Sequence, residues 1–295
     1  MEWLSYIKMS PEAFLGTIAL LGLMVGSFLN VVIFRLPIML HREWRTQCYD
    51  YLNEHDGQPI NPNNSEKFNL ITPRSRCPHC QHLISATENI PVLSFLIQRG
   101  RCRHCQKGIS WRYPLLEILT MVCSVIVAFF FGFSLPTLFA LLLTWSMIVL
   151  SAIDIEHQIL PDDITLPVLW LGLLINIQGL FSPLNDAIIG AIAGYLFLWT
   201  IYWAFKLITG KDGMGQGDFK LLAMLGAWLG WQALPTIILL SSFTGALVGI
   251  TLIVAKGHKR HQPIPFGPFL AFAGWIALLW GDKLQHVYLS FFGLA

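Results

Sequence analysis

Eight apolar runs, each close to the length at which an α-helix crosses a bilayer, constrain this chain more than any other feature of its sequence. About 20 residues span the hydrocarbon layer. Only 12% of the 295 residues are charged and 55% are hydrophobic, against about 25% charged in soluble domains. The sequence therefore predicts an all-α polytopic membrane protein with about eight transmembrane helices, near residues 13–36, 114–133, 136–153, 164–182, 186–206, 219–232, 234–255 and 266–281. The first run reads as a retained anchor rather than a cleaved signal peptide.

The basic residues predict the orientation of these helices. Ten of the 19 Lys and Arg residues fall between Pro37 and Tyr113, and cytoplasmic loops carry the excess of positive charge. We therefore expect three parts: a first transmembrane segment (1–36), a cytoplasmic loop domain (37–113) and a transmembrane core (114–295). In this topology Asp154 and Asp218 both lie at the cytoplasmic face of the membrane.

Four cysteines in the loop domain predict a metal site. Cys77, Cys80, Cys102 and Cys105 form a C-x2-C-x21-C-x2-C pattern, the spacing of a zinc ribbon. Four thiolates close the coordination shell of zinc, so the ion would be structural, and His79 and His104 are not expected among its ligands. A small loop between two spans does not favour nucleic-acid binding. We expect irregular structure in the polar stretch before the cysteines, residues 51–70.

The acids at the membrane face are candidate functional groups, because ionisable residues at membrane spans are costly. Asp218 follows three alternating glycines in "GMGQGDFKLL", residues 213–222. Its plain alternative role is to cap a helix, but a cap does not need the glycines, which permit unusual dihedrals or close approach of a bound chain. Helix capping is the preferred role of Asp162 and Asp163. Glu156 is a further candidate, and Glu117 is expected to pair with a basic neighbour such as Arg35.

Asp154 and Asp218 together suggest proton-sharing chemistry. Two neighbouring carboxylates share one proton, so that one activates water while the other polarises a peptide carbonyl. Two alternatives stay open at this point. A secondary transporter would use the same acids as ion or proton sites in a Gly-broken helix, although the two halves show no inverted repeat. A zinc-stabilised membrane scaffold would use them only as caps.

Several motifs in one order resemble those of the type IV prepilin peptidases, the GxGD membrane aspartyl proteases that both cleave and N-methylate their substrates. "GQGD" matches the GxGD motif, and the likeness covers nearly the whole chain. Further matching segments are "GSFLNVVIFRLP" (26–37), the paired cysteines, "ISWRYPLLEILT" (109–120), "IDIEHQILPDDITLP" (153–167) and "PIPFGPFLAFAG" (263–274).

The resemblance implies that Asp154 and Asp218 are the catalytic aspartates and that Gly215 and Gly217 belong to a substrate loop. It implies cleavage of basic leader peptides from prepilins and type II secretion pseudopilins at the cytoplasmic side of the bacterial inner membrane. S-adenosylmethionine would then methylate the new N-terminal residue. No Rossmann-type glycine turn marks a methyltransferase site, so no methyl-transfer residue is nominated.

Overall fold

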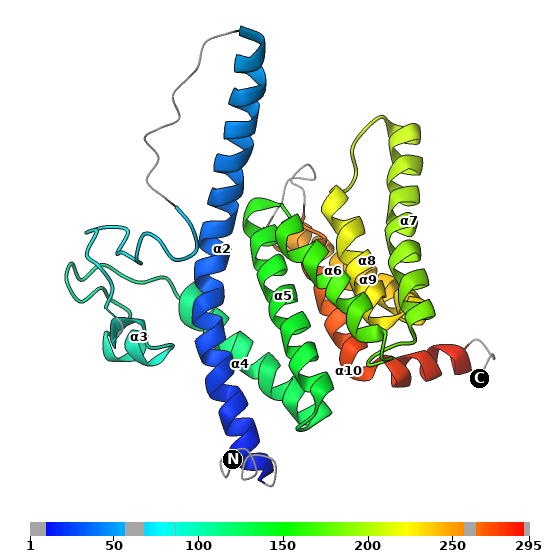
Figure 1. Ribbon diagram of the computed structural model, residues 1–295, viewed down its shortest axis with the longest axis horizontal. Coiled ribbons are helices and arrows are strands. Elements are labelled where there is room, and N and C mark those ends of the chain that lie inside the picture. The colour runs from blue at the N-terminus through cyan, green and yellow to red at the C-terminus, as the bar shows by residue number, and fades with distance from the viewer. Residues whose placement is uncertain (1–9, 57–67, 86, 257–263, 292–295) are drawn as a thin grey trace. The chain divides into compact units, whose positions relative to one another are not determined.

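A computed structural model describes residues 10–56, 68–85, 87–256 and 264–291, and within these ranges the chain is almost entirely helical (Figure 1). The described residues contain two isolated β-bridges and no strand, so the all-α prediction is confirmed. The chain divides into two compact units, residues 1–129 and 130–295, and each is described by itself. The three-part division made from the sequence stays a prediction.

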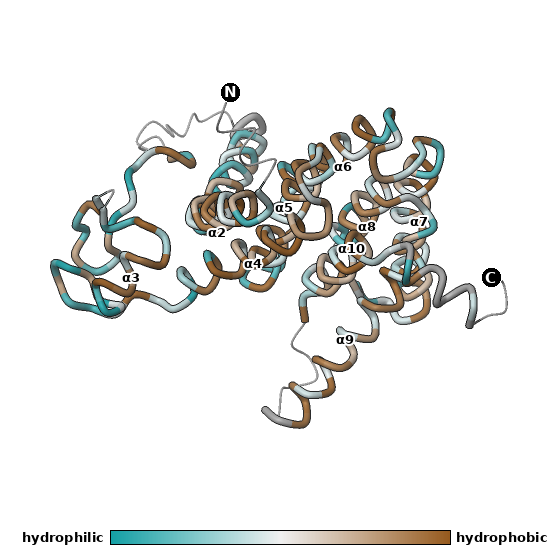
Figure 2. The backbone as a smooth tube through the Cα atoms, turned by 90° about the horizontal axis from the view of Figure 1, so that it is seen from below, coloured by the Kyte–Doolittle hydropathy of each residue, from teal (hydrophilic) through white to brown (hydrophobic). Residues whose placement is uncertain are grey.

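The first unit contains two long helices with a small lobe between them in the sequence. Helix α2 (Pro11–Asp56) has 46 residues, a length of roughly 69 Å at 1.5 Å per residue, so it far exceeds the membrane thickness. The lobe carries η1 (Thr87–Asn89) and α3 (Leu93–Ile97), and α4 (Arg112–Phe131) follows. Figure 2 shows frequent hydrophilic segments in the lobe around α3.

The prediction of irregular structure from residue 51 is wrong for residues 51–56, which continue α2; residues 57–67 lie outside the described residues. The residues that carry the helix past Pro37 contain neither Gly nor Pro, the two residue types that most disfavour a helix. Gln47 also donates a hydrogen bond to Glu43, one turn earlier, at 3.4 Å. Local propensity therefore prolongs the helix beyond its apolar part.

Two glycines one turn apart let α2 and α4 approach each other closely. A Cβ atom on Gly22 would lie 2.8 Å from the Met121 Cα, and one on Gly26 would lie 2.8 Å from the Glu117 Cα. Such Gly-xxx-Gly spacing is common where membrane helices pack, because small residues bring backbones together.

The second unit is a helical bundle built around one short helix, α8. Ten of its 14 residues are buried, and α6, α7 and α10 lie around it (Figure 2). The surrounding helices bury the polar backbone of α8 as well as its side chains. The unit comprises α5 (Leu135–His157), α6 (Asp162–Asn176), α7 (Leu184–Thr209), α8 (Gln216–Leu229), η2 (Trp231–Ala233), α9 (Leu234–Lys256) and α10 (Gly267–Phe291).

Each of three neighbouring helices presents glycine to α8. On α7, a Cβ atom at Gly190 would clash with the Gly226 carbonyl, and one at Gly194 would lie 2.7 Å from the Leu222 carbonyl oxygen. The other two glycines meet large side chains of α8, Gly172 of α6 against Trp228 and Gly274 of α10 against Leu225. Close backbone packing thus holds α8 from three sides.

A buried asparagine satisfies the C-terminal end of α8. The Asn176 Nδ2 donates to the carbonyls of Ala227 and Trp228, both at 2.9 Å, and its Oδ1 accepts from the amides of Phe181 and Ser182. Helix ends leave carbonyls without intrahelical partners, so this side chain replaces the water that a buried end lacks.

The structure has helices at all eight predicted positions, but the count of eight membrane spans is not confirmed. Among the described residues, five helices are long and apolar enough to cross a membrane: α2, α4, α5, α7 and the region Trp231–Val254 that contains α9. Helices α6 and α8 have 15 and 14 residues, and the apolar part of α10, Gly267–Gly281, is also short. The difference arises because an apolar run in the sequence does not fix helix length, and the apolar residues of α8 are buried inside the bundle.

We expect Gly190→Ala to destabilise the second unit, because the new methyl group would meet backbone atoms that cannot rotate away. Overpacking of this kind costs about 1–3 kcal/mol. Thermal unfolding in detergent should show a lower Tm. The matched control is Gly249→Ala on α9, where the nearest atom to a new Cβ is 3.6 Å away; equal Tm values for both variants would contradict the packing argument.

Candidate active site and metal site

Asp154 lies near the C-terminal end of α5 with 6% of its surface exposed. Its Oδ2 accepts a hydrogen bond from the Gly267 backbone N–H at 3.0 Å. Gly267 is the first residue of α10, so the carboxylate sits at the positive end of a helix dipole. A Cβ atom on Gly267 would lie 2.6 Å from this oxygen; only glycine allows the approach.

Asp218 is the third residue of α8, also 6% exposed. It does not cap the helix: the N-cap residue is Gly215, and no side chain makes a capping hydrogen bond there. The simplest structural role considered for this acid is therefore wrong. A buried carboxylate without a capping role is costly to keep, which favours a chemical role.

Leu160 brings the surroundings of the two acids together. A Cβ atom on Gly217, the neighbour of Asp218, would lie 2.7 Å from the Leu160 Cβ. The Leu160 Cδ2 would also lie 3.2 Å from a Cβ atom on Gly267, the partner of Asp154. The charge of Asp154 acts on Asp218. Two acids 64 positions apart in the sequence thus share one buried neighbourhood within the second unit.

Two of the three glycines before Asp218 serve close packing, and none of the three needs a left-handed backbone. Positive φ angles among the described residues do not include Gly213, Gly215 or Gly217. Gly213 packs against the Phe205 ring and Gly217 against Leu160, whereas a Cβ on Gly215 would meet only the Asp218 Oδ2, at 3.7 Å. The unusual dihedrals suggested from the sequence are thus wrong, and the close contacts are with the protein's own side chains.

Asp212 anchors the loop that leads to Asp218. Its Oδ1 accepts from the Tyr202 hydroxyl at 2.6 Å and lies 2.9 Å from the Lys206 Nζ. The Tyr202 hydroxyl and the Lys206 ammonium lower the pKa of Asp212. The Tyr202 ring also packs on Phe219, so one aromatic side chain of α7 contacts both sides of the loop.

The remaining acids of the second unit stand apart from this pair. Asp162 and Asp163 occupy the first turn of α6, but the N-cap residue is Pro161 and no side chain caps the helix; the capping prediction is wrong. Asp162 instead binds the Lys220 Nζ with both oxygens, at 2.8 and 2.7 Å. Glu156 is exposed and lies 3.9 Å from the His157 Nε2.

The pairing of Glu117 with Arg35 is also wrong. The Arg35 guanidinium donates to the backbone carbonyls of Asn69, at 2.9 Å, and Pro73. Glu117 accepts a hydrogen bond from the Val92 backbone N–H at 2.7 Å. The partners of Arg35 are backbone carbonyls of a loop, and the charges of side chains in the sequence do not predict such contacts.

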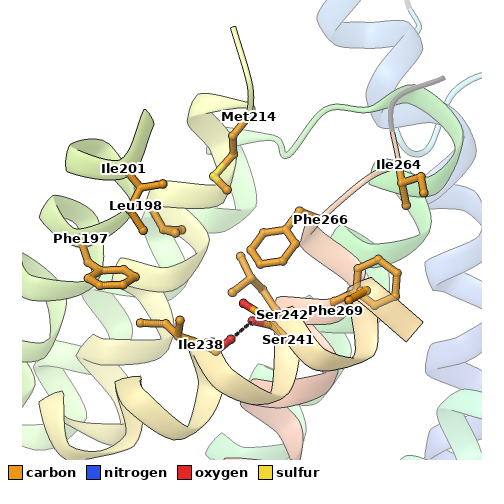
Figure 3. A pocket seen from close by; sticks show the side chains of 13 residues that line it. Phe197, Leu198, Ile201, Met214, Ile238, Ser241, Ser242, Ile264, Phe266 and Phe269 are labelled. Carbon is orange, nitrogen blue, oxygen red and sulfur yellow. Dashed lines mark hydrogen bonds between the residues drawn. The ribbon is translucent and has the colours of Figure 1, made fainter. Parts of the chain in front are cut away.

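An apolar pocket of about 420 Å³ opens between α7, α9, α10 and the glycine loop (Figure 3). Met214, four positions before Asp218, and Phe266, directly before the Asp154 partner Gly267, line it. Small residues of α9, including Ser241 and Gly245, form another side. The Ser241 hydroxyl donates to its own helix at Ile238, which leaves the lining apolar. Sequence reasoning missed this pocket, because its walls come from distant segments.

The four cysteine sulfurs form one cluster in the first unit. All four Sγ atoms lie within 4.8 Å of one another, with 3.8 Å between Cys77 and Cys105 and 4.0 Å between Cys80 and Cys102. Tetrahedral zinc with Zn–S bonds of ~2.3 Å separates its sulfurs by about 3.8 Å, whereas a disulfide needs ~2.05 Å. The donor set fits one zinc ion. His79 and His104 are not members of the cluster, as expected.

Each cysteine pair lies in a knuckle of its own, and the two knuckles, 25 positions apart, have the same backbone structure. Cys77 N–H donates to the His82 carbonyl at 2.9 Å, and Cys102 N–H donates to the Lys107 carbonyl at 2.8 Å. Gln81 and Gln106 each have a φ of 58° at the turn. Backbone N–H groups of Cys80 and His79 lower the pKa of the Cys77 thiol to about 6, which favours the thiolate that zinc binds.

We expect the purified protein to carry about one zinc ion per chain and Cys77→Ser to lose it, because three thiolates leave the tetrahedral shell incomplete. Elemental analysis after dialysis measures the content. The control is Cys48→Ser, an exposed cysteine outside the cluster, which should keep its zinc. Equal metal content in the two variants would contradict the site.

Comparison with known proteins identifies the family. The model of the bacterial peptidase A24 N-terminal domain matches residues 20–131, and that of the type IV leader peptidase family matches residues 141–250. No solved structure matches the chain.

Three curated relatives carry the name prepilin leader peptidase/N-methyltransferase. The protein of Aeromonas salmonicida is 58% identical over 280 residues, 95% of each chain. That of Pseudomonas aeruginosa is 51% identical over 99% of each chain. That of Legionella pneumophila is 46% identical over 93% of this chain and 94% of its own. The chain therefore belongs to the prepilin leader peptidase/N-methyltransferase family.

Proposed function

We propose that this protein cleaves the leader peptide from type IV prepilins and then N-methylates the new N-terminal residue. The observation that carries the proposal is the similarity over nearly the full length to relatives named for both activities, together with the leader peptidase match over residues 141–250. Type II secretion pseudopilins are the second substrate class. The transporter alternative finds no support in the comparisons or in the described residues.

Asp154 and Asp218 are the catalytic pair of this proposal. Their shared burial supports it, together with the electrostatic interaction between them. Neighbouring carboxylates in a dry site share one proton. One acid then takes a proton from water as the water attacks the scissile carbonyl, while the other donates a hydrogen bond to the carbonyl oxygen. Gly215, the N-cap residue of α8, and Gly217, in its first turn, are the substrate-contacting glycines of this proposal.

The site belongs at the cytoplasmic face of the inner membrane. The positive-inside rule supports this orientation, and so does the substrate, whose basic leader precedes an apolar membrane helix. A scissile bond at that junction lies at the membrane interface. Zinc stabilises the loop domain, since four cysteines leave no open ligand position for chemistry, and S-adenosylmethionine supplies the methyl group.

We expect Asp154→Asn and Asp218→Asn each to lower leader cleavage by roughly 100- to 10,000-fold, because neither amide can exchange a proton in the reaction. Mass spectrometry of a prepilin peptide in detergent measures the rate. Methylation of an already cleaved peptide should continue, which shows that each variant is folded.

The control for these variants is Asp163→Asn, an exposed acid of the same unit, which should cleave like the unsubstituted protein. Undiminished cleavage by either Asp154→Asn or Asp218→Asn would refute the catalytic pair.

The pocket in Figure 3 receives the first apolar residues that follow the scissile bond. Its apolar lining supports this assignment, and so do Met214 and Phe266 in its wall, close in sequence to Asp218 and to the partner of Asp154. The polar leader would lie on the other side of the acids.

We expect Gly245→Leu to lower kcat/KM for a prepilin peptide by about ten- to a hundredfold, because the new side chain would fill space that the substrate uses. A peptide with Ala in place of a large apolar residue after the scissile bond should lose less. The matched control is Gly249→Leu, one turn further along α9 and outside the pocket lining. Equal losses in the two variants would exclude the pocket from substrate binding.

A further inference from the structure

The first unit contains two buried acceptor groups whose hydrogen bonding or charge is incomplete. They lie where α2 faces the first two turns of α4, on Asn30 and Glu117. Neither has a role in the peptidase proposal, and the methyltransferase half of the proposed function still lacks residues.

The Asn30 side-chain oxygen is one of these groups. Asn30 is 7% exposed, and its Nδ2 donates to the carbonyls of Gly26, at 3.3 Å, and Tyr113, at 3.2 Å. Because a carbonyl oxygen accepts and never donates, both contacts require the NH2 end of the side chain, which fixes the orientation of the amide. Its Oδ1 is buried and receives no hydrogen bond from any described residue. Such an unmet acceptor costs about 1–3 kcal/mol, which calls for a donor that is not part of the chain.

The Glu117 carboxylate is the other group. It is 8% exposed and accepts from the Val92 N–H, with the Ser27 side chain also in hydrogen-bonding reach. Across the described ranges no charged side chain acts on Glu117. The Arg35 guanidinium contacts loop carbonyls and the Phe68 ring instead. A buried carboxylate without a counter-charge is strongly disfavoured, so this one calls for a cation.

The two groups are neighbours across one helix pair. Gly26 touches the backbone of Glu117, and Asn30 follows Gly26 by one turn of α2. Asn30 in turn bonds Tyr113, one turn before Glu117 on α4. The side chains of Trp111 and Tyr113, 68% and 42% exposed, border this end of α4.

We propose that Asn30 and Glu117 bind the primary ammonium group of a methylation reactant. An ammonium carries three N–H donors and a positive charge. It would donate a hydrogen bond to the Asn30 Oδ1 and supply the counter-charge of the Glu117 carboxylate. The inference rests on the proposed function, in which two reactants carry such a group: the methionyl part of S-adenosylmethionine and the new N-terminus of the cleaved substrate. Both fit the site by the same chemistry.

The test uses Glu117→Gln and Asn30→Leu in the full-length protein. The Gln variant keeps the shape and the acceptor for Val92 but removes the charge, and the Leu variant removes the unmet oxygen. Each should lower methylation of a cleaved peptide at least tenfold while leader cleavage and zinc content stay unchanged, which verifies folding. The control is Glu12→Gln, which changes an exposed acid of α2.

Calorimetric titration with S-adenosylmethionine distinguishes the two sources. If the site holds its methionyl ammonium, Kd rises at least fivefold in Glu117→Gln. If the site holds the substrate amine, that Kd is unchanged, whereas the KM of Glu117→Gln for the cleaved peptide rises. In the protein without substitutions, an N-acetylated peptide, which lacks the ammonium, then does not compete with the cleaved peptide.

Wild-type methylation together with wild-type Kd and KM values in both variants would overturn the inference. A protein without substitutions that neither cleaves nor methylates would instead refute the proposed function. In that case an unchanged Tm on adding S-adenosylmethionine or the cleaved peptide would overturn the ammonium site too.

Discussion

Close backbone packing around α8 is the constraint on which the second unit depends. Glycines of α6, α7 and α10 admit this helix to the centre of the bundle, and Asn176 completes its C-terminal carbonyls. Without water or lipid on any side, α8 needs every neighbour in place. This packing holds the helix whose first turn carries Asp218 in one position. A single acid on a fully supported helix start is positioned far more firmly than one on a free loop.

The surroundings of Asp154 follow the same physical logic. The start of α10 supplies a backbone N–H to its carboxylate, and Leu160, in the segment that follows α5, packs against both Gly217 and Gly267. The Leu160 side chain thus separates the start of α8, which carries Asp218, from the start of α10, which binds Asp154. Most of the residues that line the neighbouring pocket are apolar, and the Ser241 hydroxyl donates to its own helix. A dry apolar recess beside a buried acid pair suits a substrate that is polar on one side of its scissile bond and apolar on the other.

Much of the candidate site was accessible from residue patterns. The cysteine spacing predicted the cluster because a C-x2-C knuckle is a local structure, and the structure repeats it twice with the same hydrogen bonds. The order of several motifs indicated the family, which the comparisons confirm. Local reasoning failed where a partner comes from elsewhere in the chain. Asp162 was expected to cap a helix, yet Lys220 of α8 binds it. Arg35 was expected to meet an acid, yet loop carbonyls reach it first.

The sequence by itself determined the helical class, the membrane-like composition, the cluster of four cysteines and the two acids of interest, because each depends on residue type and short-range spacing. Tertiary structure alone decided which apolar helices cover one another, which glycines admit a neighbour, and which carboxylates stay buried. It also decided that Asn30 contacts Tyr113, and Gly26 the backbone of Glu117, across α2 and α4. The reason is that burial and pairing are properties of the space between helices, and the hydrophobicity of a single run does not record what lies on its other side.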